Sequence, residues 1–315
     1  MARTRYVVAV DVGGTDMKAA LVSGTPTAAT VVTSRRRVTP RGEDGTGTAH
    51  AVVSAIVELV DELRGAVDHP VDAVGVVVPG VVDEAEGIGV FSANLGWRDF
   101  PFRLLLAERT GLPVSFGHDV RAGGLAEHRL GAARGLTDVV IMPIGTGIAA
   151  ALMIGGRLHV HGGELGHVDV GHGELCGCGQ RGCVEAVASS AAIARRYSAR
   201  TGQQVDRASV VADLVRAGDP DAVAVWHDAV DALAKGILIA ATLLGPEAVV
   251  LGGGLALAGD LLIEPLRKRL AELIVFQRQP DLLLAALGDE AGCLGAALMA
   301  IDAVDAPASG GEGRT

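Results

Sequence analysis

Residues 164–185 read ELGHVDVGHGELCGCGQRGCVE, and this stretch holds three of the four cysteines of a 315-residue chain. Cys176 and Cys178 are separated by one residue, Cys183 follows, and His167 precedes all three. Three thiolates and one imidazole are a donor set that tetrahedral zinc accepts. The glycines between the cysteines permit the tight reversals that such short spacings need. The sequence therefore predicts a metal site formed by His167, Cys176, Cys178 and Cys183.

The predicted zinc ion is structural, because four protein ligands leave no open coordination position for catalysis. A loop with so few apolar residues cannot hold one shape by burial alone, and metal binding contributes to its folding free energy. A disulfide, free structural thiols and redox chemistry are the alternatives. Reduced cytosolic thiols at this spacing favour the metal.

The same loop carries polar groups that a zinc ion does not need. Glu164 and Glu185 flank it, and the second ring nitrogen of His167 can donate a hydrogen bond once the first binds metal. Carboxylates and an oriented imidazole suit the hydroxyl groups of a sugar. Solvated surface glutamates are the alternative interpretation.

Composition limits the class of protein. The length and the hydrophobic content of 49% predict a globular chain with two domains. The formal net charge of -10 argues against a nucleic-acid partner. Proline and glycine interrupt the longest apolar stretches, so we expect no membrane-spanning helix. The N-terminus lacks the pattern of a signal peptide, so we expect a cytoplasmic protein.

The sequence DVGGTDMK at residues 11–18 separates two apolar runs, a pattern of strand, glycine turn and strand. The adjacent glycines Gly13 and Gly14 would let backbone N–H groups approach a phosphate. Thr15 can add a hydroxyl donor, and Asp11 could hold a hydrated magnesium ion. A plain β-turn is the alternative.

Two further glycine motifs follow apolar runs. The first of them consists of Gly145, Thr146 and Gly147, and the second of Gly252, Gly253 and Gly254. The former repeats the pattern of strand, turn and strand, which suggests a duplicated fold with two phosphate-binding hairpins. The glycine triplet precedes a predicted helix, so its backbone could lie against the base or ribose of a nucleotide.

Two polar positions outside these motifs are candidates for substrate contacts. Asn94 lies in the loop SANLGW, which offers an amide and an aromatic platform for a sugar ring; an ordinary turn is the alternative. Asp119 follows a short predicted strand and begins a predicted helix. It is either a base that reaches a substrate hydroxyl or a helix cap that contributes about 1 kcal/mol.

Together these residues resemble the ROK family of sugar kinases and sugar-responsive repressors, and its bacterial glucokinase branch in particular. The resemblance covers nearly the whole chain. Residues 11–15 look like the first phosphate motif of the family, 145–147 like the second, and 252–254 like the adenosine motif. Residues 155–185 are similar to the family signature with its zinc loop.

The resemblance implies an α/β protein with the actin-like ATPase (ribonuclease H-like) fold, in which two domains flank a cleft. The smaller domain would comprise residues 1–118 and be joined by a C-terminal helix at 290–302. The larger domain would comprise 119–289 and hold the zinc loop. We expect the tail at 303–315 to be disordered, because it lacks large apolar residues.

The implied activity is ATP-dependent phosphorylation of a hexose hydroxyl, most simply of glucose to glucose 6-phosphate, with Asp119 as general base. The implied cofactors are ATP, Mg²⁺ and structural Zn²⁺. Residues that match sugar-binding positions are Gly80, Asn94, His118, Asp119, Glu164, His167 and Glu185. Residues that match nucleotide-binding positions are Asp11, Gly13, Gly14, Thr15, Lys18, Gly145, Thr146, Gly147, Gly252, Gly253 and Gly254.

One departure from the family pattern leaves the sugar open. His118 stands where the family usually has Asn, and an imidazole does not offer the donor and acceptor pair of an amide. An N-acetylated hexosamine, mannose or fructose could replace glucose, and a catalytically weak sugar sensor is a further alternative. A repressor would need a DNA-binding segment before the first strand. The family tends toward homodimers or tetramers.

Overall fold

The computed structural model describes residues 3–306, which form two compact α/β units. Within the described residues, unit 1 comprises 3–126 with 290–306, and unit 2 comprises Glu127–Asp289. The predicted boundary after residue 118 lies at the start of helix α3 (Asp119–Arg129), whereas the units divide within this helix. The first turns of α3 belong to unit 1 because they pack closely on its last helix: a Cβ at Gly295 would lie 2.0 Å from the carbonyl oxygen of Ala122.

Unit 1 is built on a five-stranded sheet with the order β3-β2-β1-β4-β8. Strands β1, β4 and β8 are parallel, and β2 and β3 continue the sheet as antiparallel neighbours. Every residue of β4 is buried, as expected of a strand covered on both faces. The strands are β1 (Arg5–Val12), β2 (Asp16–Thr25), β3 (Ala28–Val38), β4 (Ala73–Val78) and β8 (Val114–His118).

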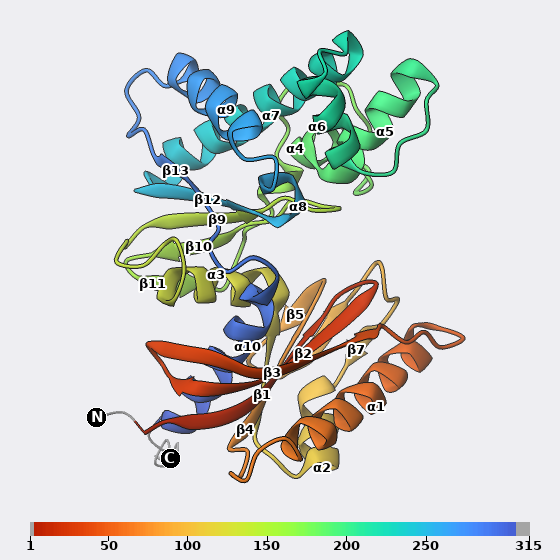
Figure 1. Ribbon diagram of the computed structural model, residues 1–315, viewed down its shortest axis with the longest axis vertical. Helices are drawn as coiled ribbons and strands as arrows, with labels where there is room; N and C mark the ends of the chain where they lie inside the picture. Colours follow the sequence, from red (N-terminus) through yellow and green to blue (C-terminus); the bar gives the residue numbers. More distant parts are fainter. Residues whose placement is uncertain (1–2, 307–315) are drawn as a thin grey trace, which may run out of the picture. The chain divides into compact units, whose positions relative to one another are not determined.

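Helices cover both faces of this sheet (Figure 1). Helix α10 (Ala291–Asp305) packs on β1 and β4, while α1 (Gly45–Arg64) and α2 (Phe102–Thr110) lie on the opposite face. The contact between α10 and β4 is so close that a Cβ at Gly75 would lie 2.1 Å from the carbonyl oxygen of Ala296. A small antiparallel sheet completes unit 1, formed by β5 (Val81–Asp83), β6 (Ile88–Phe91) and β7 (Arg98–Phe100).

The C-terminal helix is longer than the sequence predicted. Helix α10 ends at Asp305, so the prediction of disorder was wrong for residues 303–305. The apolar residues Leu298 and Ile301 are fully buried, and their packing against the sheet holds this last part of the helix. The rest of the predicted tail, residues 307–315, lies outside the described residues.

Unit 2 repeats the sheet of unit 1 strand for strand. Its order is β11-β10-β9-β12-β13, in which β9, β12 and β13 are parallel and β10 and β11 are antiparallel neighbours. This match in order and direction is the duplication that the two glycine turns suggested. The strands are β9 (Val139–Pro143), β10 (Ala151–Ile154), β11 (Arg157–His159), β12 (Ala248–Gly252) and β13 (Asp281–Leu284).

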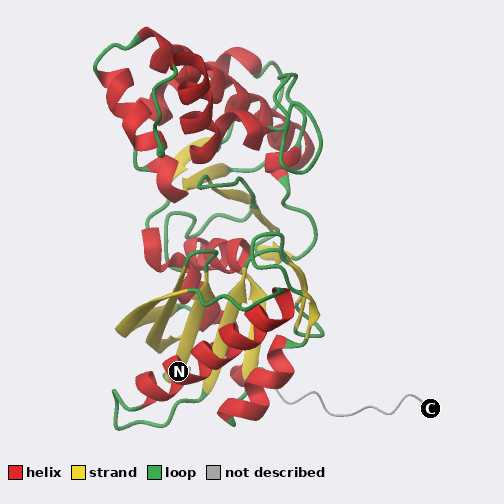
Figure 2. Ribbon diagram, turned by 90° about the vertical axis from the view of Figure 1, so that its right-hand side faces the viewer, coloured by secondary structure: helices red, strands yellow, loops and turns green. Residues whose placement is uncertain are grey.

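The helices of unit 2 gather on one side of its sheet (Figures 1 and 2). The longest, α7, is capped at its start by the Asp219 side chain and is followed by Gly245, which adopts a positive φ of 55°. The helical segment after the Cys₃His loop is divided into α4 and α5, because Ser189 is extended and caps the second of them. The helices are α4 (Val184–Ala188), α5 (Ser190–Thr201), α6 (Ala208–Arg216), α7 (Pro220–Leu244), α8 (Gly253–Ala256) and α9 (Asp260–Leu273), with short 3-10 turns η1 (Leu165–His167) and η2 (Gly288–Glu290).

One buried carboxylate accepts hydrogen bonds from two segments of unit 2 that are distant in sequence. Glu127 is 2% exposed and accepts N–H groups from Ala132 at 2.9 Å, Ala286 at 3.1 Å and Leu287 at 2.8 Å. These are the segments in which the chain enters and leaves the unit. Among residues 3–306, no helix is long and apolar enough to cross a membrane.

Candidate active site and metal centre

In unit 1 the candidate residues come together where the parallel strands end. Asp11 on β1 is paired with Val77 on β4, and the next residue of β4, Val78, is paired with His118 on β8. Carboxyl ends of neighbouring parallel strands meet at one edge of a sheet, which is where ligands bind in open α/β folds. The fold therefore places Asp11, Gly80, His118 and Asp119 along one edge.

Asp119 is the most strongly perturbed carboxylate of this edge. Burial, with the nearby charge of Asp11 as the second cause, raises its pKa to about 7. The Val120 N–H, 2.7 Å from Oδ1, and the charge of Arg121 oppose this rise without cancelling it. The side chain of Asp119 is still 29% exposed, so a substrate hydroxyl can reach it. Val120 directly follows Asp119, whereas a capping side chain accepts from the second or third residue after it, so this contact is not that of a helix cap.

His118 is a neutral neighbour of this carboxylate. Burial, with the charge of Arg121 as a second cause, lowers the pKa of His118 to about 4. Its Nδ1 lies 3.4 Å from Oδ1 of Asp119. Nδ1 is buried and has no hydrogen-bond partner within the described residues.

The sequence did not indicate an ion pair between Arg121 and Glu84, which lies beside His118 and Asp119. The Arg121 guanidinium donates to Oε1 of Glu84 at 2.7 Å, and the same oxygen accepts the backbone N–H of His118 at 3.3 Å. Glu84 lies in the turn between β5 and β6, far from Arg121 in sequence. No local pattern marks it, so only the fold reveals the pair.

The first glycine turn joins β1 to β2 as predicted. A Cβ at Gly13 would lie 2.7 Å from the carbonyl oxygen of Asp16, so the fold itself requires this glycine. A Cβ at Gly14 would meet no atom within 4 Å, so open space lies beside this residue. Lys18 is paired with Asp11 across the two strands.

The predicted sugar loop at residues 92–97 is held from within unit 1. The N–H of Gly96 donates to Ser92 O at 2.8 Å, and the Trp97 side chain is fully buried. Asn94, at the tip of the loop, is exposed. Gly80 adopts a φ of 105° and touches the backbone of Phe91, which leads into this loop.

In unit 2 the second glycine turn is closed by a carboxylate. The N–H of Gly145 donates to Gly147 O at 2.9 Å, and the N–H of Ile148 donates to Oε2 of Glu185 at 2.8 Å. A Cβ at Gly147 would lie 2.6 Å from the same Glu185 oxygen, which explains the glycine there. Thr146 is exposed at the tip of the turn. Glu185 is thus part of the turn, not a solvated glutamate.

The glycine triplet meets this turn at Ile144. The Ile144 N–H donates to Gly252 O at 2.9 Å, and the Leu255 N–H donates to Ile144 O at 3.1 Å. Gly253 has a φ of 75°, and a Cβ there would lie 2.5 Å from Ile144 O. Beside Gly254, a pocket of about 100 Å³ opens between the triplet and α6.

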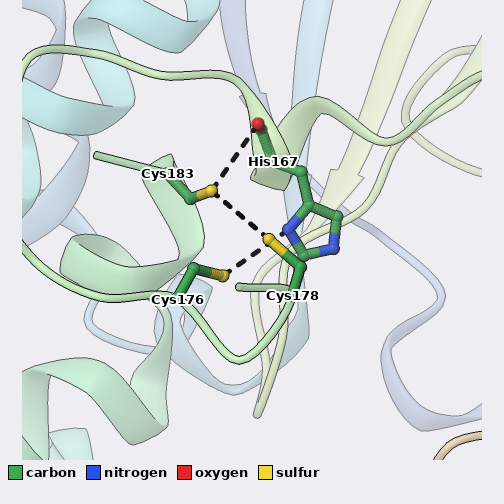
Figure 3. A group of neighbouring side chains, drawn as sticks. All are labelled: His167, Cys176, Cys178 and Cys183. Carbon is green, nitrogen blue, oxygen red and sulfur yellow. Dashed lines mark hydrogen bonds between the residues drawn. The ribbon is translucent and has the colours of Figure 1, made fainter. Parts of the chain in front are cut away.

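The predicted metal ligands converge on one point (Figure 3). One ligand atom from each of the four residues lies within 4.8 Å of the others. Cys176 Sγ lies 3.7 Å from His167 Nδ1, and Cys178 Sγ lies 3.7 Å from Cys183 Sγ. Sulfur ligands at about 2.3 Å from a tetrahedral ion are separated by about 3.8 Å, whereas disulfide sulfurs are about 2.05 Å apart. All cysteines are free, so the disulfide alternative is wrong.

Two of the predicted sugar-binding residues, Glu164 and Glu185, lie next to the Cys₃His cluster. The other ring nitrogen of His167, Nε2, lies 4.0 Å from Oε2 of Glu164. Cys176 Sγ lies 4.0 Å from Oε1 of Glu185. The structure therefore gathers Glu164, His167 and Glu185 around the cluster in unit 2.

The predicted site residues thus form two sets, one in each unit. Unit 1 holds the residues from Asp11 to Asp119, and unit 2 holds those from Gly145 to Gly254.

Comparisons with known proteins agree with this arrangement of motifs. The family model described as "ROK family" matches residues 7–303. Glucokinase from Thermotoga maritima is 35% identical over 92% of this chain and 96% of its own length. Among solved structures, a ROK hexokinase from Thermus thermophilus is 34% identical with a TM-score of 0.80, covering 95% of this chain and 99% of the other.

A second solved structure is a ROK family glucokinase from Streptomyces griseus in complex with glucose and AMPPNP. It is 30% identical, with a TM-score of 0.78, and the match covers 94% of this chain and 99% of that one. The α/β architecture is accordingly the actin-like ATPase fold of these relatives. The duplicated sheets, the glycine motifs and the Cys₃His loop, together with a family match over nearly the whole chain, lead to one conclusion: this protein belongs to the ROK family.

Proposed function

We propose that this sugar kinase transfers a phosphoryl group from ATP to a hexose hydroxyl, most simply converting glucose to glucose 6-phosphate. The observation that carries the proposal is Asp119, whose pKa is raised to about 7 beside Asp11 at the ends of parallel strands. The ROK hexokinase and glucokinases to which the chain is similar support the same activity.

In this proposal Asp119 is the general base. A base is most effective when its pKa is near the working pH, and Asp119 meets this condition. Its carboxylate would accept the proton from the attacking sugar hydroxyl, while the rest of the site positions the groups and stabilises charge. His118 stays neutral at pH 7, so it would offer an uncharged imidazole to the sugar.

The nucleotide would be held by backbone groups and one carboxylate. Asp11 would hold Mg²⁺, because a carboxylate at a strand end is a ligand that this ion accepts. The glycine turns at 13–15 and 145–147 would receive the phosphates. The triplet at 252–254 and the pocket beside Gly254 would receive the adenosine.

The Cys₃His cluster fits zinc in both chemistry and spacing. We propose that zinc is structural here and that it holds His167 and Glu185 in place for the sugar. His167 would bind the ion through Nδ1, which leaves Nε2 directed toward Glu164 and able to donate a hydrogen bond.

The test is ADP release with magnesium and ATP across a panel of glucose, mannose, fructose and N-acetylated hexosamines. The same panel is run with Asp119→Asn and with Asp61→Asn as control, since Asp61 is an exposed carboxylate on α1. We expect one sugar to be phosphorylated by the wild type and the control but not by Asp119→Asn. Absence of turnover with every sugar would refute the proposed function.

A further inference from the structure

Residues 39–41 donate hydrogen bonds to the backbone carbonyl groups of the first glycine turn. Thr39 Oγ1 donates to Gly13 O at 2.7 Å, and the Thr39 N–H donates to Thr15 O at 2.8 Å. The Arg41 guanidinium donates through Nη2 to Gly14 O at 2.8 Å. The carbonyl oxygens of Gly13, Gly14 and Thr15 therefore all accept hydrogen bonds from this one segment.

This arrangement fixes where the N–H groups of the turn point. In a trans peptide the C=O and the following N–H point in opposite directions, and the chain has no cis peptide bond among its described residues. Because Gly13 O and Gly14 O point to Thr39 and Arg41, the N–H groups of Gly14 and Thr15 point away from them. Neither N–H makes a hydrogen bond within the described part of the chain, so both can receive an anion.

The same guanidinium also binds the predicted sugar loop. Nη1 of Arg41 donates to Asn94 O at 2.5 Å. Nearby, the backbones are in direct contact, since a Cβ at Gly45 would lie 1.9 Å from Gly96 O. One side chain thus spans the phosphate turn and the sugar loop, both of which belong to unit 1.

Arg41 is suited to this role by its charge and shape. It is exposed, and no carboxylate lies within ion-pair distance of it among residues 3–306. A planar guanidinium can donate to two carbonyl oxygens at once, whereas a lysine ammonium is a point charge on a flexible stem. Hydrogen bonds from a charged donor are stronger than those between neutral groups.

We propose that Arg41 is a positioning residue that orients the phosphate turn and fixes its distance from the Asn94 loop, so that nucleotide and hexose binding are coupled through it. This inference rests on the proposed function, because it assigns the nucleotide phosphates to the turn and the hexose to the loop. The coupling is reciprocal: sugar tightens nucleotide binding by the same factor by which nucleotide tightens sugar binding.

The test measures the dissociation constant of glucose, or of the sugar that the panel identifies, with and without saturating magnesium AMPPNP. The ratio of the two constants is the coupling factor. We expect a factor above one in the wild type, a fall to about one in Arg41→Ala, and little recovery in Arg41→Lys. We also expect nucleotide affinity to fall by about tenfold in Arg41→Ala, in line with the loss of charge-assisted hydrogen bonds.

The control is Arg37→Ala, which removes the same charge from unit 1 but breaks contacts only with Glu58 and Glu62 of α1. The proposal is overturned if the wild-type factor is one, if Arg41→Ala retains the wild-type factor, or if Arg37→Ala loses it equally. Because Arg41 is exposed, its variants should fold, and unchanged thermal unfolding would confirm this. Failure of the wild type to phosphorylate any sugar would instead refute the proposed function, and the binding measurement would still test the coupling.

Discussion

Replacing Asp119 by Asn tests the chemistry and the electrostatics of the site together. Loss of a general base lowers kcat by about 10²- to 10⁴-fold, and the amide keeps the shape of the side chain. In the wild type, a base with a pKa of about 7 is about one-tenth ionised at pH 6 and about nine-tenths ionised at pH 8. We therefore expect kcat/KM to rise about tenfold between these two pH values, and this pH dependence to disappear in Asp119→Asn.

The same substitution should stabilise the fold although it removes the activity. The folded-state pKa of Asp119 lies above its ordinary value of 3.8, so the folded protein favours the protonated carboxyl. The ionised carboxylate therefore destabilises the fold increasingly as pH rises from about 4 to 7. The shift corresponds to at most about 4 kcal/mol, and to about 1 to 2 kcal/mol for a partly exposed side chain. Asp119→Asn should gain this free energy of unfolding at pH 8 and none at pH 4.

The assay combines initial rates of ADP release from pH 5.5 to 8.5 with urea unfolding at pH 4 and pH 8. A companion variant, Asp11→Asn, tests the second cause of the shift, because removing the like charge should lower the carboxyl pKa of Asp119 in nucleotide-free protein, as measured by NMR. Turnover by Asp119→Asn within tenfold of the wild type would refute the role of the base. If kcat/KM instead falls only near pH 4, the conclusion that the pKa of Asp119 is raised would be refuted.

Four further substitutions test other parts of the structure. Cys178→Ser should lose bound zinc and lower the thermal unfolding temperature; zinc analysis of freshly purified wild type must find about one ion per chain for this reasoning to hold. Gly14→Ala should leave thermal unfolding unchanged, since its Cβ meets open space, yet raise the KM for ATP at least tenfold, whereas Gly13→Ala should destabilise the fold. Glu127→Ala should lower the free energy of unfolding by about 3 kcal/mol, because three backbone N–H groups lose their buried acceptor; a loss below 1 kcal/mol in urea unfolding would contradict this role of Glu127.

Features that depend on neighbouring residues could be predicted from the sequence. The Cys₃His cluster and the glycine turns are encoded by short spacings, and the structure places them as expected. The role of Glu185 was only partly visible: the sequence shows a glutamate after Cys183, but its bond to Ile148 depends on how the loop folds back.

Contacts between distant segments could not be predicted. Arg41 reaches Asn94 across 53 residues, and Arg121 reaches Glu84 across 37, without any periodicity that links them. The predicted boundary after residue 118 differs from the division between the two units for a related reason. Helix α3 continues without interruption through Ala126, so no turn or change in composition marks the place where its contacts pass from one unit to the next.

The place of α10 in unit 1 has a consequence for biosynthesis. The face of β1 and β4 that this helix covers is made of residues that precede unit 2 in the sequence, whereas the helix follows unit 2. A nascent chain emerging from the ribosome would carry this apolar face uncovered while the whole of unit 2 is made and can fold. Unit 1 can close only after unit 2 has been made, so its sheet needs chaperone protection during that time, and a chain that stops before Ala291 exposes a surface prone to aggregate.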